Sequence, residues 1–366
     1  MTGSGFLPRK NFQQLFDVLQ QQGFRCIGPR VVDDAIVYTD IDSSDDLSRG
    51  IEVEQQPGRY ALSQHNHQRQ FAWSNSAQAL KPLTFASREI LWQCHKDEQG
   101  NLNFEQHRPT VDNIAFIGAR ACDLAAFRLQ QQHFLKPQAT DPWFKQRMSH
   151  MLIIAVHCSH ASATCFCSNT GDGPEVEQDF DIAMHELDDG FIVQAGSYNG
   201  EKILALLQLD ATTDDQTQQA EQQLAQCASQ QNRRLPDQLQ HRLLAQLDNA
   251  HWQQIGERCL SCGNCTAVCP TCFCHQQHDE LSIPDNTGTH FRQWSSCFTH
   301  NHSYISGHSF RPDSASRYRQ WATHKFANWF EQYGRSGCVG CGRCISWCPV
   351  GIDVTAELQQ LCGDAS

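Results

Sequence analysis

The sequence lacks the features of a membrane-embedded, secreted or nucleic-acid-binding protein. Its longest unbroken apolar run is Met151–Val156, which is far too short to cross a bilayer. The first residues, MTGSGFLPRKNFQQLF, do not contain the apolar core of a signal peptide. Basic residues are also scarce, because 28 Lys and Arg stand against 40 Asp and Glu and the net charge is −12, whereas nucleic-acid-binding surfaces are basic. We therefore expect a cytoplasmic protein with no membrane span and no nucleic-acid partner.

Common phosphate-binding loops are absent as well. The chain has no G-x-G-x-x-G after a predicted strand, which is the fingerprint of nicotinamide-binding folds. TGDGP at residues 170–174 is rich in glycine but lacks the Gly-Lys-Ser/Thr ending of a P-loop, and we interpret it as a turn. Nucleotide and flavin binding are therefore expected on another chain.

Cysteine, in contrast, is abundant, with 19 residues. Without a secretion signal, so many cysteines indicate metal ligation in a reducing compartment rather than disulfides. Eight of them form two runs of the same spacing, CLSCGNCTAVCP at 259–270 and CVGCGRCISWCP at 338–349. Each reads Cys-x-x-Cys-x-x-Cys-x-x-x-Cys-Pro, the bacterial ferredoxin run that surrounds a [4Fe–4S] cluster.

The ligand sets follow from the exchange seen in two-cluster ferredoxins, in which the fourth cysteine of a run binds the other cluster. We predict a first [4Fe–4S] cluster on Cys259, Cys262, Cys265 and Cys348. A second is predicted on Cys338, Cys341, Cys344 and Cys269. Gly263, Gly340 and Gly342 suit loops whose backbone approaches a cluster closely. The alternative is zinc, but structural zinc sites use separated Cys-x-x-Cys pairs or Cys/His mixtures, and neither run has that form.

The remaining pattern predicts an α+β chain. Residues 1–248 are expected to form a mixed α/β domain, and residues 249–366 a mainly helical, dicluster ferredoxin-like domain. Apolar residues at helical spacing predict a helix over 10–22 that ends at Gly23. The strand NIAFIG, a following helix and the strand MLIIAVHC predict a βαβ unit. Residues 213–247, interrupted by Pro236, are expected to form two connecting helices.

Four further cysteines are candidates for a third iron–sulfur cluster. They lie near the carboxyl ends of the two predicted strands and in ATCFCSNTGDGP, and are Cys122, Cys158, Cys165 and Cys167. Ligands of open α/β sheets gather at such strand ends. The alternative is that these thiols are small buried hydrophobic side chains, as free cysteines often are, and the spacing leaves both interpretations open. Four more cysteines are isolated and receive no role: Cys26, Cys94, Cys227 and Cys362.

The stretch between the two runs adds two expectations. Thiols and imidazoles just after the first run, Cys272, Cys274, His275 and His278, are expected to pack around the first cluster, and Cys297 likewise. Residues 312–333 are predicted to form a helix that Ser314 or Ser316 caps and Gly334 ends. This most basic segment is interpreted as a solvated face; a docking face for an acidic partner and compensation of cluster charge are the alternatives.

The chain resembles the iron–sulfur β subunits of soluble NAD(P)-linked [NiFe] hydrogenases, or sulfhydrogenases, and the iron–sulfur relay subunit of anaerobic sulfite reductase. The resemblance rests on GRYALS, GARACDLAAF, HCSHASATCFCSNTGDGP, CLSCGNCTAVCPTCFC, SCFTHNHSYISGHSFRPDSASRYRQW and SGCVGCGRCISWCPVGID. It implies an electron-transfer subunit beside a flavoprotein that handles NAD(P)H and a catalytic hydrogenase or related redox subunit. It also favours the third cluster, because its four candidate ligands fall inside these motifs.

The function predicted from the sequence is therefore a relay that needs no catalytic residue of its own. Electrons would pass between the flavin partner and the catalytic subunit, most naturally a hydrogenase. One alternative is a relay for a sulfite-reductase-type enzyme. Another is a stand-alone iron–sulfur reductase with a substrate site at the N-terminal cysteines, and a redox sensor is a third.

Overall fold

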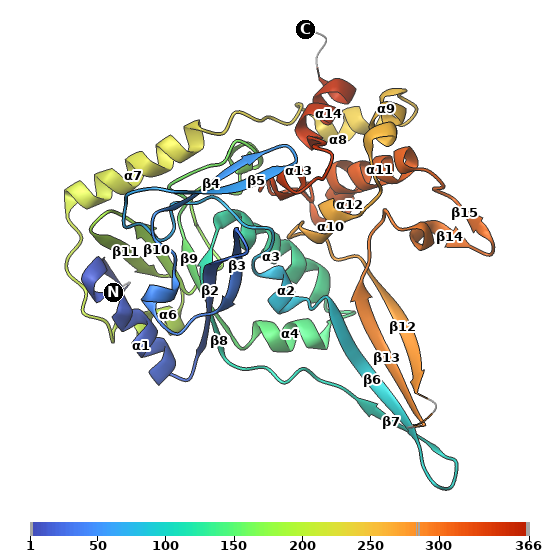
Figure 1. Ribbon diagram of the computed structural model, residues 1–366, viewed down its shortest axis with the longest axis horizontal. Coiled ribbons are helices and arrows are strands. Elements are labelled where there is room, and N and C mark those ends of the chain that lie inside the picture. Colours follow the sequence, from blue (N-terminus) through green and yellow to red (C-terminus); the bar gives the residue numbers. More distant parts are fainter. Residues whose placement is uncertain (1–2, 283, 285, 364–366) are drawn as a thin grey trace.

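A computed structural model describes residues 3–282, 284 and 286–363 (Figure 1). It combines helices and sheets, and the predicted α+β class is confirmed. A seven-stranded sheet organises the N-terminal half, whereas short helices and cysteine loops organise the C-terminal half. Among the described residues, no helix is long and apolar enough to span a membrane.

The large sheet is mixed, with the order β1-β11-β10-β9-β8-β2-β3. Its strands are β1 (Ser4–Pro8), β2 (Arg25–Val32), β3 (Ala35–Asp40), β8 (Ile114–Ala119), β9 (Met151–Val156), β10 (Ile182–Glu186) and β11 (Gly190–Ala195). The four central strands run parallel, and the edge strands pair antiparallel. β8, α3 (Ala121–Phe134) and β9 form the predicted βαβ unit. The apolar runs of the two strands are buried on both faces of the sheet, as is usual for parallel strands.

Helices cover both faces of this sheet (Figure 1). Ile117 and Ile154 point to one face and pack with α1 (Gln13–Gln21) and α6 (Tyr198–Leu204). Phe116 and Ile153 point to the other face and pack with α3 and α4 (Pro142–Met148). The predicted first helix is confirmed as α1, with Gly23 in the left-handed region just after it. The predicted connecting helices are α7 (Asp214–Ser229) and α8 (Leu239–Leu244).

The C-terminal half packs short helices around an aromatic core that contains Tyr318, Trp321 and Phe326. They are α9 (His251–Arg258), α10 (Asn264–Ala267), α11 (Ser314–Thr323), a π-helical turn η4 (His324–Asn328), α12 (Trp329–Tyr333), α13 (Arg343–Ser346) and α14 (Val354–Cys362). The predicted serine cap of α11 is wrong. Asp313 is the N-cap and accepts a hydrogen bond from the Ser316 amide at 2.7 Å, since a carboxylate at this position also compensates the helix dipole.

A second sheet of four strands takes two strands from each half of the chain. Its order is β12 (His275–Ser282), β13 (Thr287–Trp294), β6 (Arg88–Lys96) and β7 (Leu102–Gln106). It forms an arm that extends away from the rest of the molecule (Figure 1). At its base Arg292 and Glu89, both buried, form an ion pair at 2.6 Å. The predicted domain boundary near residue 248 stays a prediction, but this sheet crosses it.

The remaining elements are short. They are the hairpin β4 (Ile51–Gln56) and β5 (Arg59–Gln64), the ribbon β14 (Tyr304–Ile305) and β15 (His308–Ser309), α2 (Lys81–Thr84), α5 (Cys167–Thr170), η1 (Arg9–Asn11), η2 (Ser44–Asp46) and η3 (His300–Ser303). The β4–β5 hairpin reaches the second cysteine run, where the Gly58 amide donates to the Ile345 carbonyl at 3.1 Å. Tyr60 packs against Trp347 with ring centroids 4.8 Å apart.

Candidate metal centre

The first cysteine run and the last cysteine of the second run line one cavity. Cys259, Cys262, Cys265 and Cys348 all border it, beside Phe298, Tyr318 and Trp321. Gly263 begins α10 with a φ of 75°, which turns the chain so that Cys262 and Cys265 face the same space. The structure thus brings together the four thiols predicted for the first cluster. Their assignment as ligands stays a prediction.

The second predicted set also converges. The Cys344 thiol lies close enough to Cys338, Cys341 and Cys269 for their charges to raise its pKa. The charges of Cys341 and Cys269 likewise raise the pKa of Cys338. Cys344 also borders the cavity of the first set. The two sets are therefore neighbours, and each is completed by the fourth cysteine of the other run.

Backbone amides point at several of these sulfurs. The amides of Ser261, Gly340 and Ile352 donate to the Sγ atoms of Cys259, Cys338 and Cys348 at 3.4, 3.4 and 3.3 Å. Hydrogen bonds to cysteine sulfur are a feature of protein-bound iron–sulfur clusters, because they stabilise thiolate charge. The residues present therefore fit a cubane cluster at each of the two sets.

Two buried lysines lie against the second set. Lys325 Nζ is 3.3 Å from Cys269 Sγ, 2.8 Å from Thr271 Oγ1 and 3.2 Å from the Gly337 carbonyl. Lys81 Nζ lies 3.2 Å from the Cys269 carbonyl and packs over the Trp294 ring. Hydrogen bonding from Cys272 and the Lys325 ammonium lower the pKa of Cys269 well below that of an ordinary thiol. Lys325 therefore belongs to the centre, although the sequence placed it on a solvated helix face.

The other cysteines of this half surround the same region. Cys272 and Cys274 border a neighbouring cavity that Lys81 and Cys262 also line. Cys297 lies close enough to Cys265 to affect its charge. His275 packs edge-on against Phe85 and His278 against Phe291. Within residues 3–282, 284 and 286–363, no three His, Cys, Asp or Glu side chains are grouped so that they could hold a single metal ion.

The four N-terminal candidates do not form one equal group. Cys158 packs against Cys165, and Cys167 senses the charges of both. Cys122, in the first turn of α3, instead contacts the group that contains Cys167 and Cys341 of the second run. Burial raises the pKa of the Cys158 thiol to about 11. The structure thus brings three candidates together and places Cys122 between them and the second set.

Sequence reasoning missed a fifth thiol in this region. Cys227 on α7 is fully buried, packs with Cys165, and senses the charges of Cys158 and Cys165. A single cysteine in a glutamine-rich helix carries no spacing signal, so only the three-dimensional arrangement reveals it.

Two glycines join the second run to this thiol group. Gly340 accepts a hydrogen bond from the Phe166 amide at 2.8 Å. Both Gly340 and Gly342 have positive φ, and a Cβ on either would collide with backbone atoms of residues 164–167. Because only glycine permits this approach, the segment that carries Cys165 and Cys167 lies directly on the loop of the second set.

Comparisons with known proteins agree with this geometry. A protein-family model described as a 4Fe-4S dicluster domain matches residues 258–352. The sulfhydrogenase 2 subunit beta of Pyrococcus furiosus is 28% identical over 289 residues, which cover 77% of this chain and 82% of that protein. The chain is similar to this sulfhydrogenase β subunit. The resemblance predicted from the sequence motifs is thereby confirmed. No solved structure matches the chain significantly. Iron–sulfur clusters and an electron-transfer role of hydrogenase type are supported at this level.

Proposed function

We propose that this chain is the electron-relay subunit of a hydrogenase-type complex, between an NAD(P)H-binding flavoprotein and a catalytic subunit. One observation carries the proposal. Two neighbouring sets of four thiols are each completed by a cysteine of the other run, within a region that matches a 4Fe-4S dicluster domain. This is the arrangement of a two-cluster ferredoxin.

The ligands in this proposal are the eight cysteines predicted from spacing. Cys259, Cys262, Cys265 and Cys348 would hold the first cluster. Cys338, Cys341, Cys344 and Cys269 would hold the second. When bound, such clusters accept and release single electrons. The amides that donate to sulfur and the ammonium of Lys325 stabilise negative charge at these positions.

The first set is the one that faces outward. Cys262 is exposed, and the neighbouring Leu260 and Val350 are 63% and 40% exposed. In the second set Cys341 is buried. We infer that the surface around Leu260 and Val350 meets a redox partner, because electron transfer needs a short distance between the exchanging groups.

The partners are inferred from the relative and from what the sequence lacks. The relative is named as a subunit of a sulfhydrogenase, and this chain carries no nicotinamide fingerprint. A flavoprotein subunit would therefore bind NAD(P)H, and a hydrogenase subunit would act on hydrogen.

A stand-alone reductase with its substrate site at the N-terminal cysteines is less well supported. Cys122, Cys165 and Cys167 are 6–7% exposed, and Cys227 is fully buried. Cys158 is the partly exposed member of this group, so most of these thiols are closed to a substrate.

The proposal is tested by purifying the tagged chain without oxygen from its own cells. A flavoprotein and a [NiFe] subunit are expected to copurify, and the complex is expected to reduce NAD(P)⁺ with hydrogen. A Cys262→Ala complex should lose this reaction while the catalytic subunit still reduces an artificial dye with hydrogen. Cys94→Ala, on β6 and outside both sets, is the control. Oxidation of NADH by the isolated chain would contradict the proposal.

A further inference from the structure

The N-terminal thiols form a second cysteine-rich centre behind the dicluster region. Cys165 and Cys227 share one packed group, against which Cys158 lies. Cys167 senses the charges of Cys165, Cys158 and Cys227. Three thiols, from the end of β9, the 165–167 turn and α7, therefore pack together, and Cys167 lies two residues beyond Cys165 in the same turn.

The position of Cys227 is unusual for the helix that carries it. α7 is rich in glutamine, and among its residues only Ala220 and Cys227 are buried. Cys227 has no exposed surface and lies among other thiols instead of in an aliphatic core. Ala220 packs against Phe6 and Leu187, so the second buried contact of this polar helix is the one that Cys227 makes with Cys165 and Cys158.

A buried cation faces the thiols without an acidic partner. Arg120 has no exposed surface, and its guanidinium donates to the carbonyls of Phe71, Trp73 and His157 at 2.9, 2.8 and 3.3 Å. In the part of the chain that the structure describes, no carboxylate pairs with this guanidinium, and its Nε has no hydrogen-bond partner. The nearby Asp123 carboxylate pairs instead with Arg343 at 2.8 Å.

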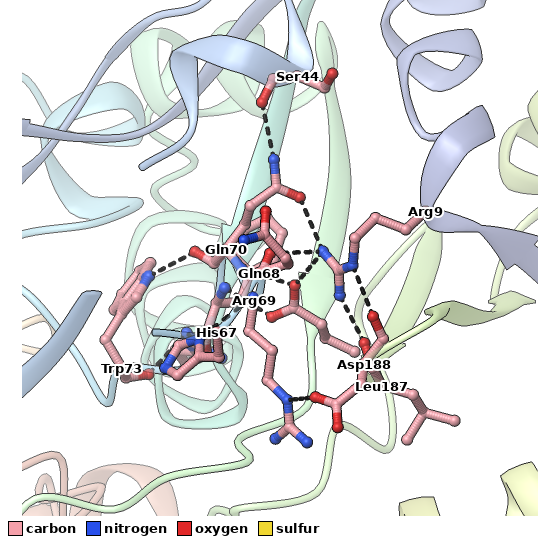
Figure 2. A network of polar contacts seen from close by, with 12 residues as sticks. Arg9, Ser44, His67, Gln68, Arg69, Gln70, Trp73, Leu187 and Asp188 are labelled. Atoms are coloured by element: carbon pink, nitrogen blue, oxygen red, sulfur yellow. Dashed lines mark hydrogen bonds and ion pairs between the residues drawn. The ribbon is translucent and has the colours of Figure 1, made fainter. Parts of the chain in front are cut away.

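This cation is fixed in place by a rigid network. Figure 2 shows Arg9, Gln70 and Trp73 in that network. Glu186 pairs with Arg9 at 3.0 Å and accepts the amides of Gln70 and Phe71 at 2.7 Å each. The same segment supplies the carbonyls that hold Arg120, so the guanidinium cannot swing toward solvent.

An unpaired buried charge costs several kcal/mol, so the position of Arg120 indicates an anion in the assembled protein. Cys158 and Cys227 are the two thiols of this group whose pKa the Arg120 charge lowers. Buried polar groups approach the other sulfurs: Gln231 Nε2 donates to Cys167 Sγ at 3.4 Å, and Ser162 Oγ and Cys165 Sγ share a hydrogen bond of 3.2 Å in which either can donate. A cation and hydrogen-bond donors around four thiols match the environment of cluster thiolates.

We propose that Cys158, Cys165, Cys167 and Cys227 bind a third [4Fe–4S] cluster. Cys227 thus takes the place that the sequence pattern gave to Cys122. Cys122 lies between Cys167 and Cys341 and bridges the third and second sets by packing, not by ligation. Only the role of this third cluster, one more electron carrier in the relay, depends on the proposed function. The choice of its ligands depends on the contacts described above.

Iron and acid-labile sulfide per chain, measured on the full chain prepared without oxygen, test the proposal. We expect about twelve irons in the unaltered protein, since each cubane holds four. Cys227→Ala should retain about eight, with the EPR signals of the other two clusters intact. Cys122→Ala should retain all twelve. Cys26→Ala, which removes an equally buried thiol from β2, is the matched control and should also retain twelve.

A second variant covers the case in which Cys227→Ala detaches α7. Cys227→Ser keeps the size of the side chain, and a serine oxygen as ligand would shift the EPR signal of the third cluster. An unchanged signal would overturn the proposal. The proposal would also be overturned by about eight irons in the unaltered protein, or by loss of four irons in Cys122→Ala but not in Cys227→Ala. A chain with twelve irons but no flavoprotein partner would refute the relay function and leave the third cluster standing.

Discussion

At the scale of single residues, Lys325 is predicted from the sequence to be exposed but is buried in the structure. The basic segment that contains it reads as an exposed helix, and most of its cations are exposed or partly exposed. Lys325 lies instead in the π-helical turn η4, which directs its ammonium to Cys269 Sγ at 3.3 Å. A change of helical period is invisible in a residue pattern, because the extra residue per turn is set by packing.

The charge of Lys325 should raise the reduction potential of the second proposed cluster. Lys325→Met removes a cation that stabilises the reduced, more negative state, so the potential should fall by about 50 mV, roughly a tenfold change in the equilibrium constant for one electron. An EPR-monitored redox titration measures this shift. Lys202→Met, an exposed lysine that packs over Tyr198, should leave all potentials unchanged. Equal potentials in Lys325→Met and the unaltered chain would contradict the assignment of Cys269.

Burial of His185 on β10 should make stability depend on pH. Burial lowers its pKa from 6.5 to about 4 in the folded chain, so below pH 6.5 the unfolded chain binds the proton more tightly. Stability should therefore fall as the pH drops from 7.5 to 5, by about 2 kcal/mol from this group. His185→Gln should reduce the fall in stability by about that amount, as measured by denaturation at both pH values, while other buried histidines such as His157, whose pKa is lowered to about 3, keep the rest of the slope. A variant with the same slope as the unaltered chain would show that His185 does not contribute.

At the scale of elements, local sequence patterns predicted the helices and strands that local interactions determine. The helix before Gly23, the βαβ unit and the two connecting helices follow from local periodicity and appear in the structure. Three thiols of each run converge because ligand spacing within a tight loop is also local, and the exchange of the fourth cysteine follows the pattern of two-cluster ferredoxins. Cys227 and the pairing of β6 with β13 were not predictable, because each depends on contacts between residues far apart in the chain.

The contact between the second run and the N-terminal thiols depends on Gly342. Its φ is 74°, and a Cβ there would collide with the Thr164 carbonyl. Gly342→Ala should therefore destabilise the folded chain by at least about 3 kcal/mol. Gly334→Ala is the matched control, since its φ is 72° but nothing lies near its Cβ position; it should cost only the backbone penalty of about 1 kcal/mol. Denaturation midpoints under anaerobic conditions compare the two, and equal midpoints would argue against this close approach.

At the scale of the whole molecule, the two halves share structure. The four-stranded arm combines β6 and β7 with β12 and β13, and Lys81 from the N-terminal half touches the first run through the carbonyls of Thr266, Ala267 and Cys269. The dicluster region is thus built into a larger fold, unlike a small ferredoxin that folds by itself.

A fragment of residues 249–366 should consequently fail to hold stable clusters. It loses the strand partner of β13, the Glu89 partner of Arg292 and the Lys81 ammonium. We expect well below eight irons per fragment and rapid cleavage by protease, whereas the full chain should keep its iron and resist the protease. Coexpression of residues 1–248 as a separate chain should restore the iron content. A fragment that alone keeps about eight irons would establish the boundary near residue 248 as that of an independent domain.

The placement of Cys348 beside Cys259, Cys262 and Cys265 also has a consequence for biosynthesis. A ribosome releases the first run long before it reaches Cys348, so the nascent chain offers only three of the four thiols to an iron–sulfur donor. Neither proposed cluster can be completed until the second run has been translated and has folded back on the first. Maturation of these two clusters should therefore be a late, coupled event, in which iron starvation yields chains that hold neither or both of them instead of chains that hold one of the two.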